Sequence, residues 1–242
     1  MYEKIKSLAK QYYPETVAIR RDLHKYPEQG WLEMRTASLV AKKLEKLGYQ
    51  VLIGKEIMCE EYRMGVPDQE ILESNYQRAI SQGADPYYIK KVKDGFTAVA
   101  GILKNGSGPV VAIRFDMDAL CIEEDDSINH NPGKFGFISC NQGTMHACGH
   151  DGHMAILLGA AKMLMSMKDR IEGDVYLAFQ PAEETGAGAP DFIKFGDWYD
   201  KVDAIFGGHV WIDLPAGLIS VEEGPRMAAS SQITINVKGK QG

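Results

Sequence analysis

One short segment of the chain concentrates the residue types that bind metals. It reads NQGTMHACGHDGHMAILLGAAKML over residues 141–164, in a chain that has only six histidines and four cysteines. Its candidate residues are His146, Cys148, His150, Asp151 and His153. The paired Cys-x-x-Cys spacing of structural zinc sites is absent. Any one of these histidines alone is more simply a core or surface residue, but their concentration beside a cysteine indicates a metal site.

Two further places in the sequence offer ligands or a base. Glu183 and Glu184 follow the apolar run VYLAFQ and a proline turn, and His209 follows the apolar run AIFGG. Taken singly, a solvated pair of glutamates and a hydrogen-bonded core histidine explain them equally well. Because adjacent side chains in extended chain diverge, Glu184 can bind a metal while Glu183 faces the substrate as a base.

Several residues are candidates for supporting the ligands. Asp116 and Asp118 stand two apart at the end of an apolar run, so their carboxylates point the same way. They either form a turn or a helix cap, or they orient a metal-bound imidazole. Asp151 is placed to cap the helix that follows it, and with His153 it is expected to lie around the ligands.

Taken together, these residues predict a catalytic metal site. The proposed ligands are Cys148, His150, Glu184 and His209. Their mixed sulfur, nitrogen and oxygen donors suit Zn²⁺, and Mn²⁺ or Co²⁺ is also compatible. The set makes either one closed site or most of a site for two divalent metal ions about 3.5–4 Å apart. A closed structural site leaves Glu183 without a role, which favours catalysis.

The rest of the sequence must supply the elements that bring these residues together. Helical periodicity covers residues 5–26, 36–47, 68–82 and 154–167, and strand-like runs cover 49–53, 96–103, 110–115, 173–180, 202–210, 216–222 and 231–239. This alternation predicts a three-layer α/β sandwich with a mixed, mostly parallel sheet, in which ligands lie beyond the carboxyl ends of strands. The polar segment 54–95 interrupts it as an insertion.

Composition excludes some classes of function. The 242 residues are 45% hydrophobic and 25% charged, as in soluble globular proteins, and the net charge of −6 gives no footprint for nucleic acid. No apolar run approaches the ~20 residues of a membrane span, and no signal peptide is recognisable. The four cysteines form no disulfide framework, so a cytoplasmic protein is expected.

Five sequence motifs occur along the chain in a characteristic order. They are RRDLHKYPEQGWLEMRTASLVAKKL, RFDMDAL, MHACGHDGHMAILLGAAKML, FQPAEE and GGHV. The chain resembles the amidohydrolase branch of the co-catalytic metallopeptidases, which includes hippurate hydrolases, N-acyl-amino-acid amidohydrolases and auxin-conjugate hydrolases. The resemblance implies the same four ligands, Glu183 as general base and Asp118 as a supporting acid.

The resemblance also implies a substrate and an organisation. The substrate is an N-acyl amino acid of the aminobenzoyl-glutamate kind, and the assembly is a homodimer or a hetero-oligomer with a related subunit. Residues 1–228 are expected to form part of the catalytic domain, and residues 229–242 to begin a lid or dimerisation domain. We expect the rest of the lid, with a fifth ligand (a histidine), to lie beyond Gly242, and residues 1–242 alone to turn over weakly.

Two other functions are compatible with the same residues. In the first, Cys148 is the nucleophile of a thiol hydrolase and His150 its base, which leaves Glu183, Glu184 and His209 unused. In the second, the chain is a metal-binding module that is either truncated and inactive or completed by a partner chain. Inhibition by a chelator rather than by an alkylating agent separates the metal hydrolase from the thiol hydrolase.

Overall fold

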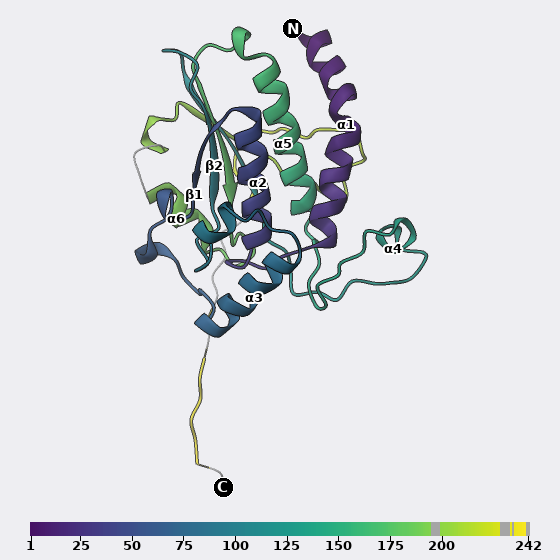
Figure 1. The fold of residues 1–242 in the computed structure, drawn as a ribbon, viewed down its shortest axis with the longest axis vertical. Helices are drawn as coiled ribbons and strands as arrows, with labels where there is room; N and C mark the ends of the chain where they lie inside the picture. The colour runs from purple at the N-terminus through teal and green to yellow at the C-terminus, as the bar shows by residue number, and fades with distance from the viewer. Residues whose placement is uncertain (195–198, 228–232, 234, 241–242) are drawn as a thin grey trace. The chain divides into compact units, whose positions relative to one another are not determined.

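The computed structural model describes residues 1–194, 199–227, 233 and 235–240 (Figure 1). The chain forms two compact units, residues 1–210 and 211–242. All helices and strands assigned in the described residues belong to the first unit. None of the described helices has both the length and the apolar character that a membrane crossing requires.

A five-stranded sheet forms the centre of the first unit. Its strands are β1 (Gln50–Ile53), β2 (Val99–Leu103), β3 (Val110–Asp116), β4 (Asp174–Gln180) and β5 (Ala204–Gly207). They lie in the order β1-β2-β4-β3-β5. β3 pairs in parallel with β4 and β5, whereas β2 pairs antiparallel with β1 and β4. Only β2 therefore runs against the other four strands, which confirms the predicted mixed, mostly parallel sheet.

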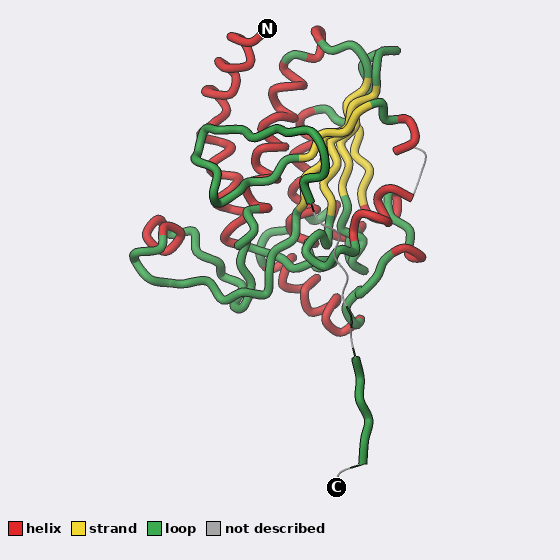
Figure 2. The backbone as a smooth tube through the Cα atoms, turned by 180° about the vertical axis from the view of Figure 1, so that it is seen from behind, coloured by secondary structure: helices red, strands yellow, loops and turns green. Residues whose placement is uncertain are grey.

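Helices cover the sheet. α2 (Met34–Leu47) and α5 (His150–Ser166) pack on one face, and α1 (Tyr2–Lys25) packs against α5 (Figures 1 and 2). The other α-helices are α3 (Gln69–Ser81), α4 (Asn131–Phe135) and α6 (Gly188–Lys194). Short 3-10 helices are η1 (Gly54–Glu56), η2 (Glu60–Tyr62), η3 (Tyr88–Lys91), η4 (Lys168–Arg170) and η5 (Tyr199–Lys201). α3 and the first three 3-10 helices lie within the segment 54–95 that the sequence marked as an insertion.

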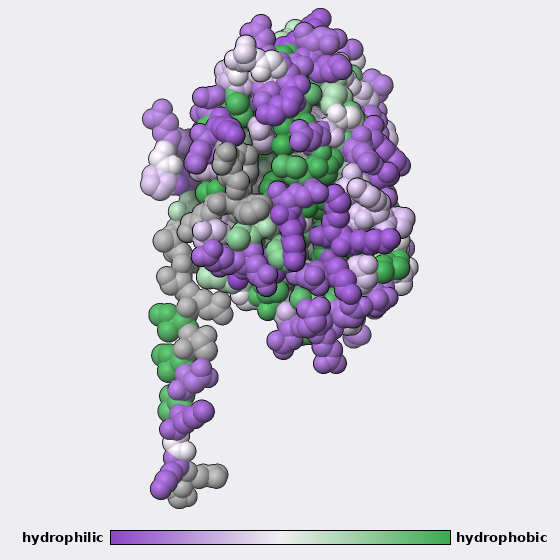
Figure 3. Space-filling view, turned by 60° about the vertical axis from the view of Figure 1, so that its left-hand side comes forward, coloured by the Kyte–Doolittle hydropathy of each residue, from purple (hydrophilic) through white to green (hydrophobic). Residues whose placement is uncertain are grey.

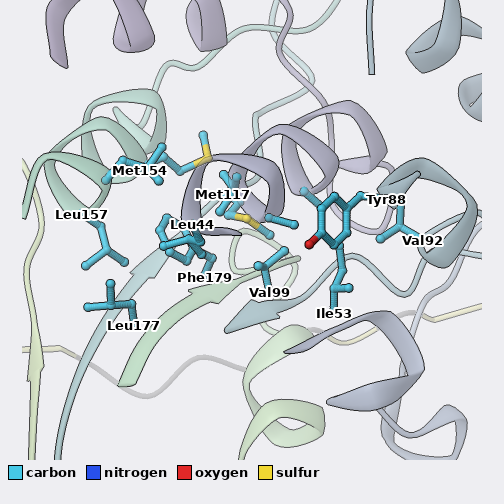
Figure 4. Close-up of a cluster of buried hydrophobic side chains, with 14 of the residues drawn as sticks. Leu44, Ile53, Tyr88, Val92, Val99, Met117, Met154, Leu157, Leu177 and Phe179 are labelled. Carbon is cyan, nitrogen blue, oxygen red and sulfur yellow. The ribbon is translucent and has the colours of Figure 1, made fainter. Parts of the chain in front are cut away.

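β4 contributes to a hydrophobic core on each of its faces. Leu177 and Phe179 join the cluster beneath α2 and α5, together with Leu44 and Met154 (Figure 4). The alternate residues Tyr176 and Ala178 join a second cluster on the opposite face. Because neighbouring strand residues point to opposite faces, a strand buried on both sides must be apolar on both, as residues 175–179 of β4 are.

The sheet has an exposed apolar edge. β5 is the last strand in the sheet order, and its residues Ile205 and Phe206 are 49% and 62% exposed. More widely, hydrophobic side chains reach the surface between polar ones on the face shown in Figure 3. β5 pairs with β3, but its apolar side chains remain exposed in the described structure.

One predicted helix and one predicted strand differ from what is observed, and another predicted strand lies partly outside the described residues. The helix predicted from residue 154 begins four residues earlier, at His150, and Gly149 is its N-cap instead of Asp151. Gly149 has a φ of 84°, which a glycine adopts without steric cost. The strand predicted over residues 216–222 is not formed, since these residues pair with no strand in the described part of the chain. The one predicted over residues 231–239 lies partly outside the described residues.

Candidate metal centre

The three parallel strands end at the same edge of the sheet, and each is followed by a candidate residue. Asp116 is the last residue of β3, the glutamates 183–184 follow β4, and His209 follows β5. His150 begins α5, which packs against β3 and β4. The parallel pairing therefore brings together side chains that are up to about a hundred positions apart in sequence.

His150 is the centre of this cluster and is completely buried. Its Nδ1 atom lies 3.4 Å from Asp118 Oδ1, and its Nε2 atom lies 3.5 Å from Asp116 Oδ1. The same Nε2 atom lies 3.6 Å from Glu184 Oε1 and 3.9 Å from Glu183 Oε2. One imidazole thus faces four carboxylates.

Cys148 and His209 lie beside this imidazole. Cys148 Sγ is 3.4 Å from His209 Nε2. Two ligands of one tetrahedral zinc ion, with bonds of ~2.3 Å to sulfur and ~2.1 Å to nitrogen, are separated by roughly 3.6 Å. The donor atoms of Cys148, His150 and His209 all lie within 4.8 Å of one another, and so do those of His150, Glu183 and Glu184. Both groups are compact enough to hold a metal ion, and they share His150.

Several polar atoms of the cluster are buried without a hydrogen-bond partner among the described residues. They are both ring nitrogens of His150 and the Oε1 atom of Glu184. An unsatisfied buried polar group costs about 1–3 kcal/mol, so such atoms call for an explanation. A bound divalent cation would satisfy Glu184 Oε1 and one ring nitrogen of His150, and the thiol, imidazole and carboxylate donors suit such ions. The residues present therefore fit a metal centre.

The charges of the cluster also favour a cation. Burial, and then the negative charges of Glu184 and Glu183, raise the pKa of the Cys148 thiol to about 12. Burial and the charge of Asp116 raise the pKa of Glu183. Burial opposes ionisation of Asp116 too, but the hydrogen bond from His153 and the charge of His150 outweigh it and lower its pKa to about 2. A metal ion reverses the effect on the thiol, because coordination stabilises the thiolate.

Asp118 holds the chain that carries the two glutamates. It accepts the backbone N–H groups of Glu183 through Oδ1 and of Glu184 through Oδ2, each at 3.0 Å. Its side chain is buried, at 1% exposure. Asp118 therefore fixes the backbone of both glutamates.

His153 supports the cluster from α5. Its donor atoms form a third compact group with those of Asp116 and His150, all within 4.8 Å of one another. However, His153 accepts the Val210 N–H at Nε2 (2.9 Å), so its Nδ1 carries the proton and donates to Asp116 Oδ1. Both ring nitrogens of His153 are thereby engaged in hydrogen bonds within the protein.

Two other candidates of the histidine-rich segment lie apart from the cluster. Asp151 Oδ2 forms an ion pair with Arg20 Nε (2.8 Å) and accepts a hydrogen bond from His24 Nδ1 (2.7 Å), and both partners are on α1. His146 is 4% exposed, and neither of its ring nitrogens has a hydrogen-bond partner in the described structure. Burial lowers the pKa of His146 to about 4, so it is neutral. Of the three histidines in the segment, His146 is the one outside the groups that could hold a metal among the described residues.

The sequence did not point to two residues that contact the site. Arg114 donates from Nη1 to Asp116 Oδ2 (3.0 Å), and Glu33 accepts the backbone N–H of Ala182 (2.8 Å). Arg114 lies inside a strand, and Glu33 stands before a helix, where an acidic residue usually reads as a cap. No local pattern distinguishes Glu33, because its partner is distant in sequence, and Arg114 reads as an ordinary strand residue although Asp116 is only two positions away.

Comparisons with known proteins agree with this geometry. Two curated relatives are one of the subunits of the p-aminobenzoyl-glutamate hydrolase of Escherichia coli and the indole-3-acetyl-aspartic acid hydrolase of Enterobacter agglomerans. The first is 43% identical over 90% of this chain and 50% of its own length, and the second is 44% identical over 87% and 48%. The chain thus spans about half the length of the curated relatives it matches.

A solved structure and a family model complete the comparison. A dinuclear metal-binding peptidase of Bacillus subtilis superposes with a TM-score of 0.65 at 35% identity, covering 89% of this chain and 48% of its own. The model of peptidase family M20/M25/M40 matches residues 112–239, a range that includes every proposed ligand. The resemblance and the α/β fold expected from the sequence motifs are confirmed. The chain belongs to peptidase family M20/M25/M40.

Proposed function

We propose that this chain supplies the metal centre and the general base of a hydrolase that cleaves the amide bond between an acyl or aroyl group and an amino acid. The observation that carries the proposal is the convergence at one sheet edge of the four proposed ligands, Cys148, His150, Glu184 and His209. Family membership supports hydrolysis, and the dinuclear centre of the Bacillus subtilis relative supports two divalent ions, Zn²⁺, Mn²⁺ or Co²⁺.

The two adjacent glutamates have different surroundings, which supports different roles. The Glu184 side chain is 20% exposed and its Oε1 atom is buried without a hydrogen-bond partner among the described residues, as suits a metal ligand. The Glu183 side chain is 30% exposed, so its carboxylate can reach a water or a substrate. Its raised pKa brings it closer to the neutral range in which a general base works best.

The chemistry follows from these positions. Bound divalent ions supply Lewis acidity and lower the pKa of a water at the centre. The Glu183 carboxylate takes a proton from the attacking water and delivers it to the nitrogen of the leaving amino acid. Asp118 holds the backbone of both glutamates during these transfers, and His153 holds the chain beside His209. No covalent intermediate with Cys148 is required.

The names of the two curated relatives support a substrate class. One acts on p-aminobenzoyl-glutamate and the other on indole-3-acetyl-aspartic acid, and both substrates join an aromatic acyl group to an acidic amino acid. We propose the same class here, aminobenzoyl-glutamate included. Since the first relative is named as one subunit of its hydrolase, a hetero-oligomer with a related subunit is the proposed assembly, with a homodimer as the alternative.

The electrostatic surroundings of Cys148 disfavour the thiol-hydrolase alternative. A nucleophilic cysteine needs a thiolate, yet burial and the neighbouring carboxylates raise the pKa of Cys148 to about 12. A metal-binding module without activity has the same ligands as the hydrolase. A measurement of catalysis distinguishes the hydrolase from the inactive module. Glu183 has a role only in the hydrolase.

Metal content and hydrolysis measured together test the proposal. Zinc or manganese bound after dialysis is expected to fall in Cys148→Ser and Glu184→Gln, and to stay at the wild-type level in Glu183→Gln and in Cys121→Ser, an exposed-cysteine control. Aminobenzoyl-glutamate hydrolysis, assayed with the related subunit present, is expected to be lost in Glu183→Gln. Wild-type metal content in both ligand variants contradicts the site, and activity in Glu183→Gln contradicts the base.

A further inference from the structure

Two buried glutamates at the start of α2 make different contacts. Glu33 occupies the N-cap position, yet its side chain makes no hydrogen bond to the first turn of the helix. Glu28 caps the helix instead: its Oε1 accepts the Arg35 N–H (3.1 Å) and its Oε2 accepts the Thr36 N–H (2.8 Å). Because Glu28 satisfies the helix terminus, Glu33 is free to bind elsewhere.

Glu33 reaches the chain that carries the two proposed catalytic-site glutamates. Its Oε1 accepts the backbone N–H of Ala182 at 2.8 Å, and its Oε2 accepts the hydroxyl of Thr97 at 2.6 Å. Both Glu33 and Thr97 have 0% exposure. Burying a carboxylate this deeply costs desolvation free energy, and the two hydrogen bonds of Glu33 offset that cost.

The backbone that Glu33 holds has an uncommon conformation. Ala182 has a φ of 49°, in the left-handed region that a residue with a Cβ atom rarely adopts. Gly30 packs against it so closely that a Cβ atom at Gly30 would lie 3.1 Å from Ala182 Cα. Immediately after this bend, Asp118 accepts the N–H groups of Glu183 and Glu184. Two carboxylates from distant parts of the chain thus fix three consecutive peptide groups.

We infer that Glu33 is a positioning residue, which directs the carboxylates of Glu183 and Glu184 into the cluster by holding Ala182 in its left-handed conformation. It touches neither glutamate and acts through the backbone alone. Its effect on metal binding rests on the proposed function, whereas its effect on the segment 182–184 does not. The two effects are therefore measured separately.

The first measurement is hydrogen–deuterium exchange of residues 182–184 in metal-free protein. Glu33→Met removes both hydrogen bonds at similar volume, and exchange is expected to accelerate on the order of tenfold through local opening. Glu33→Gln keeps an oxygen for Ala182 and offers N–H groups to Thr97, so it is expected to match the wild type. Glu28→Met is the matched control, because it removes a buried glutamate that never contacts this segment.

The second measurement is the dissociation constant for Zn²⁺, by competition with a chromophoric chelator. Glu33→Met is expected to weaken binding about 10–100-fold, as loss of an outer support of a metal ligand does, while Glu33→Gln and Glu28→Met leave it unchanged. If Glu33→Met fails to fold, Thr97→Val, which removes one of the two bonds of Glu33, is expected to give a smaller change in the same direction.

The outcomes distinguish this inference from the proposed function. Unchanged exchange at 182–184 in Glu33→Met, or equal acceleration in Glu28→Met, overturns the positioning role of Glu33. Accelerated exchange in a chain whose wild type binds no Zn²⁺ supports that role and contradicts the metal centre. Rescue of both exchange and affinity by Glu33→Gln supports the inference in full.

Discussion

The Nδ1 atom of His153 and the Oδ1 atom of Asp116 are 2.5 Å apart, and both side chains have 0% exposure. On its other side, the same imidazole accepts the backbone N–H of Val210. The end of β3 is thereby connected through one ring to the residue after His209. A proposed metal ligand that follows a sheet-edge strand is thus fixed by a residue of α5.

Replacing His153 removes this connection and leaves a buried carboxylate with fewer partners. A hydrogen bond to a charged group typically contributes about 1.5–3 kcal/mol, and because Arg114 still pairs with Asp116, we expect a loss of about 2 kcal/mol in the free energy of unfolding for His153→Leu. Urea titration measures it. His130→Leu is the control, since His130 is 28% exposed and its loss leaves Glu124 bound to His24. Equal losses in both variants contradict the role of His153.

Metal ions are expected to stabilise the folded chain. At a free concentration of about a hundred times its dissociation constant, an ion that binds only the folded state raises the free energy of unfolding by ~2.7 kcal/mol. Thermal or urea unfolding with and without Zn²⁺ or Mn²⁺ measures this increment, and a chelator reverses it. Glu184→Gln, which lacks a proposed ligand, is expected to show a much smaller increment. An identical response of this variant argues against Glu184 as a ligand.

A single methyl group at Gly188 is expected to destabilise the turn after the glutamates. A Cβ atom there would lie 1.7 Å from the carbonyl oxygen of Pro181, which is backbone and cannot rotate away. Gly188→Ala is therefore expected to cost about 1–3 kcal/mol of unfolding free energy. Gly152→Ala meets no atom within 4 Å and lies inside α5, so it is expected to stabilise by about 0.5–1 kcal/mol. Chemical denaturation compares them, and a neutral Gly188→Ala refutes the prediction.

The buried His24 makes the stability depend on pH. Burial lowers its pKa, but hydrogen bonds to Asp151 and Glu124 outweigh burial, and the net pKa is raised above 6.5. A group with a raised folded-state pKa contributes fully below its unfolded value and loses that contribution as the pH rises through the folded one. Stability of the wild type is therefore expected to fall above pH 6.5 more steeply than that of His24→Gln, which does not titrate. Parallel curves of urea midpoint against pH exclude this contribution.

Local patterns in the sequence predicted most of the sheet and the main helices. β4 is recognisable because seven residues in a row read as a strand buried on both faces, and α2 because Gly48, with a φ of 93°, ends an amphipathic run. Among the proposed ligands, Glu184 and His209 were recognisable as candidates because each follows an apolar strand. The parallel pairing that joins these strand ends is a general rule of α/β sheets.

Other features depend on contacts that no local pattern encodes. His146 and His150 stand four residues apart in one motif, yet only His150 of the two faces the carboxylates, because the left-handed Gly149 starts α5 at that position. Asp151 reads as a helix cap, but its partners Arg20 and His24 are on α1. Glu33 likewise acquires its contact with Ala182 only when α2 and β4 are assembled. Tertiary packing decides such roles.

The order of the strands has a consequence for how the protein folds. The pairing of β3 with β4 begins at residues 110 and 174, and the pairing of β3 with β5 begins at residues 111 and 204. Both pairings join segments that are far apart in sequence. Pairings so distant in sequence slow two-state folding to milliseconds or longer, because large loops must close first. The carboxyl ends of these strands assemble in that late step. Since His209 follows β5, the four proposed ligands are all available during synthesis only after the ribosome has released the segment containing β5.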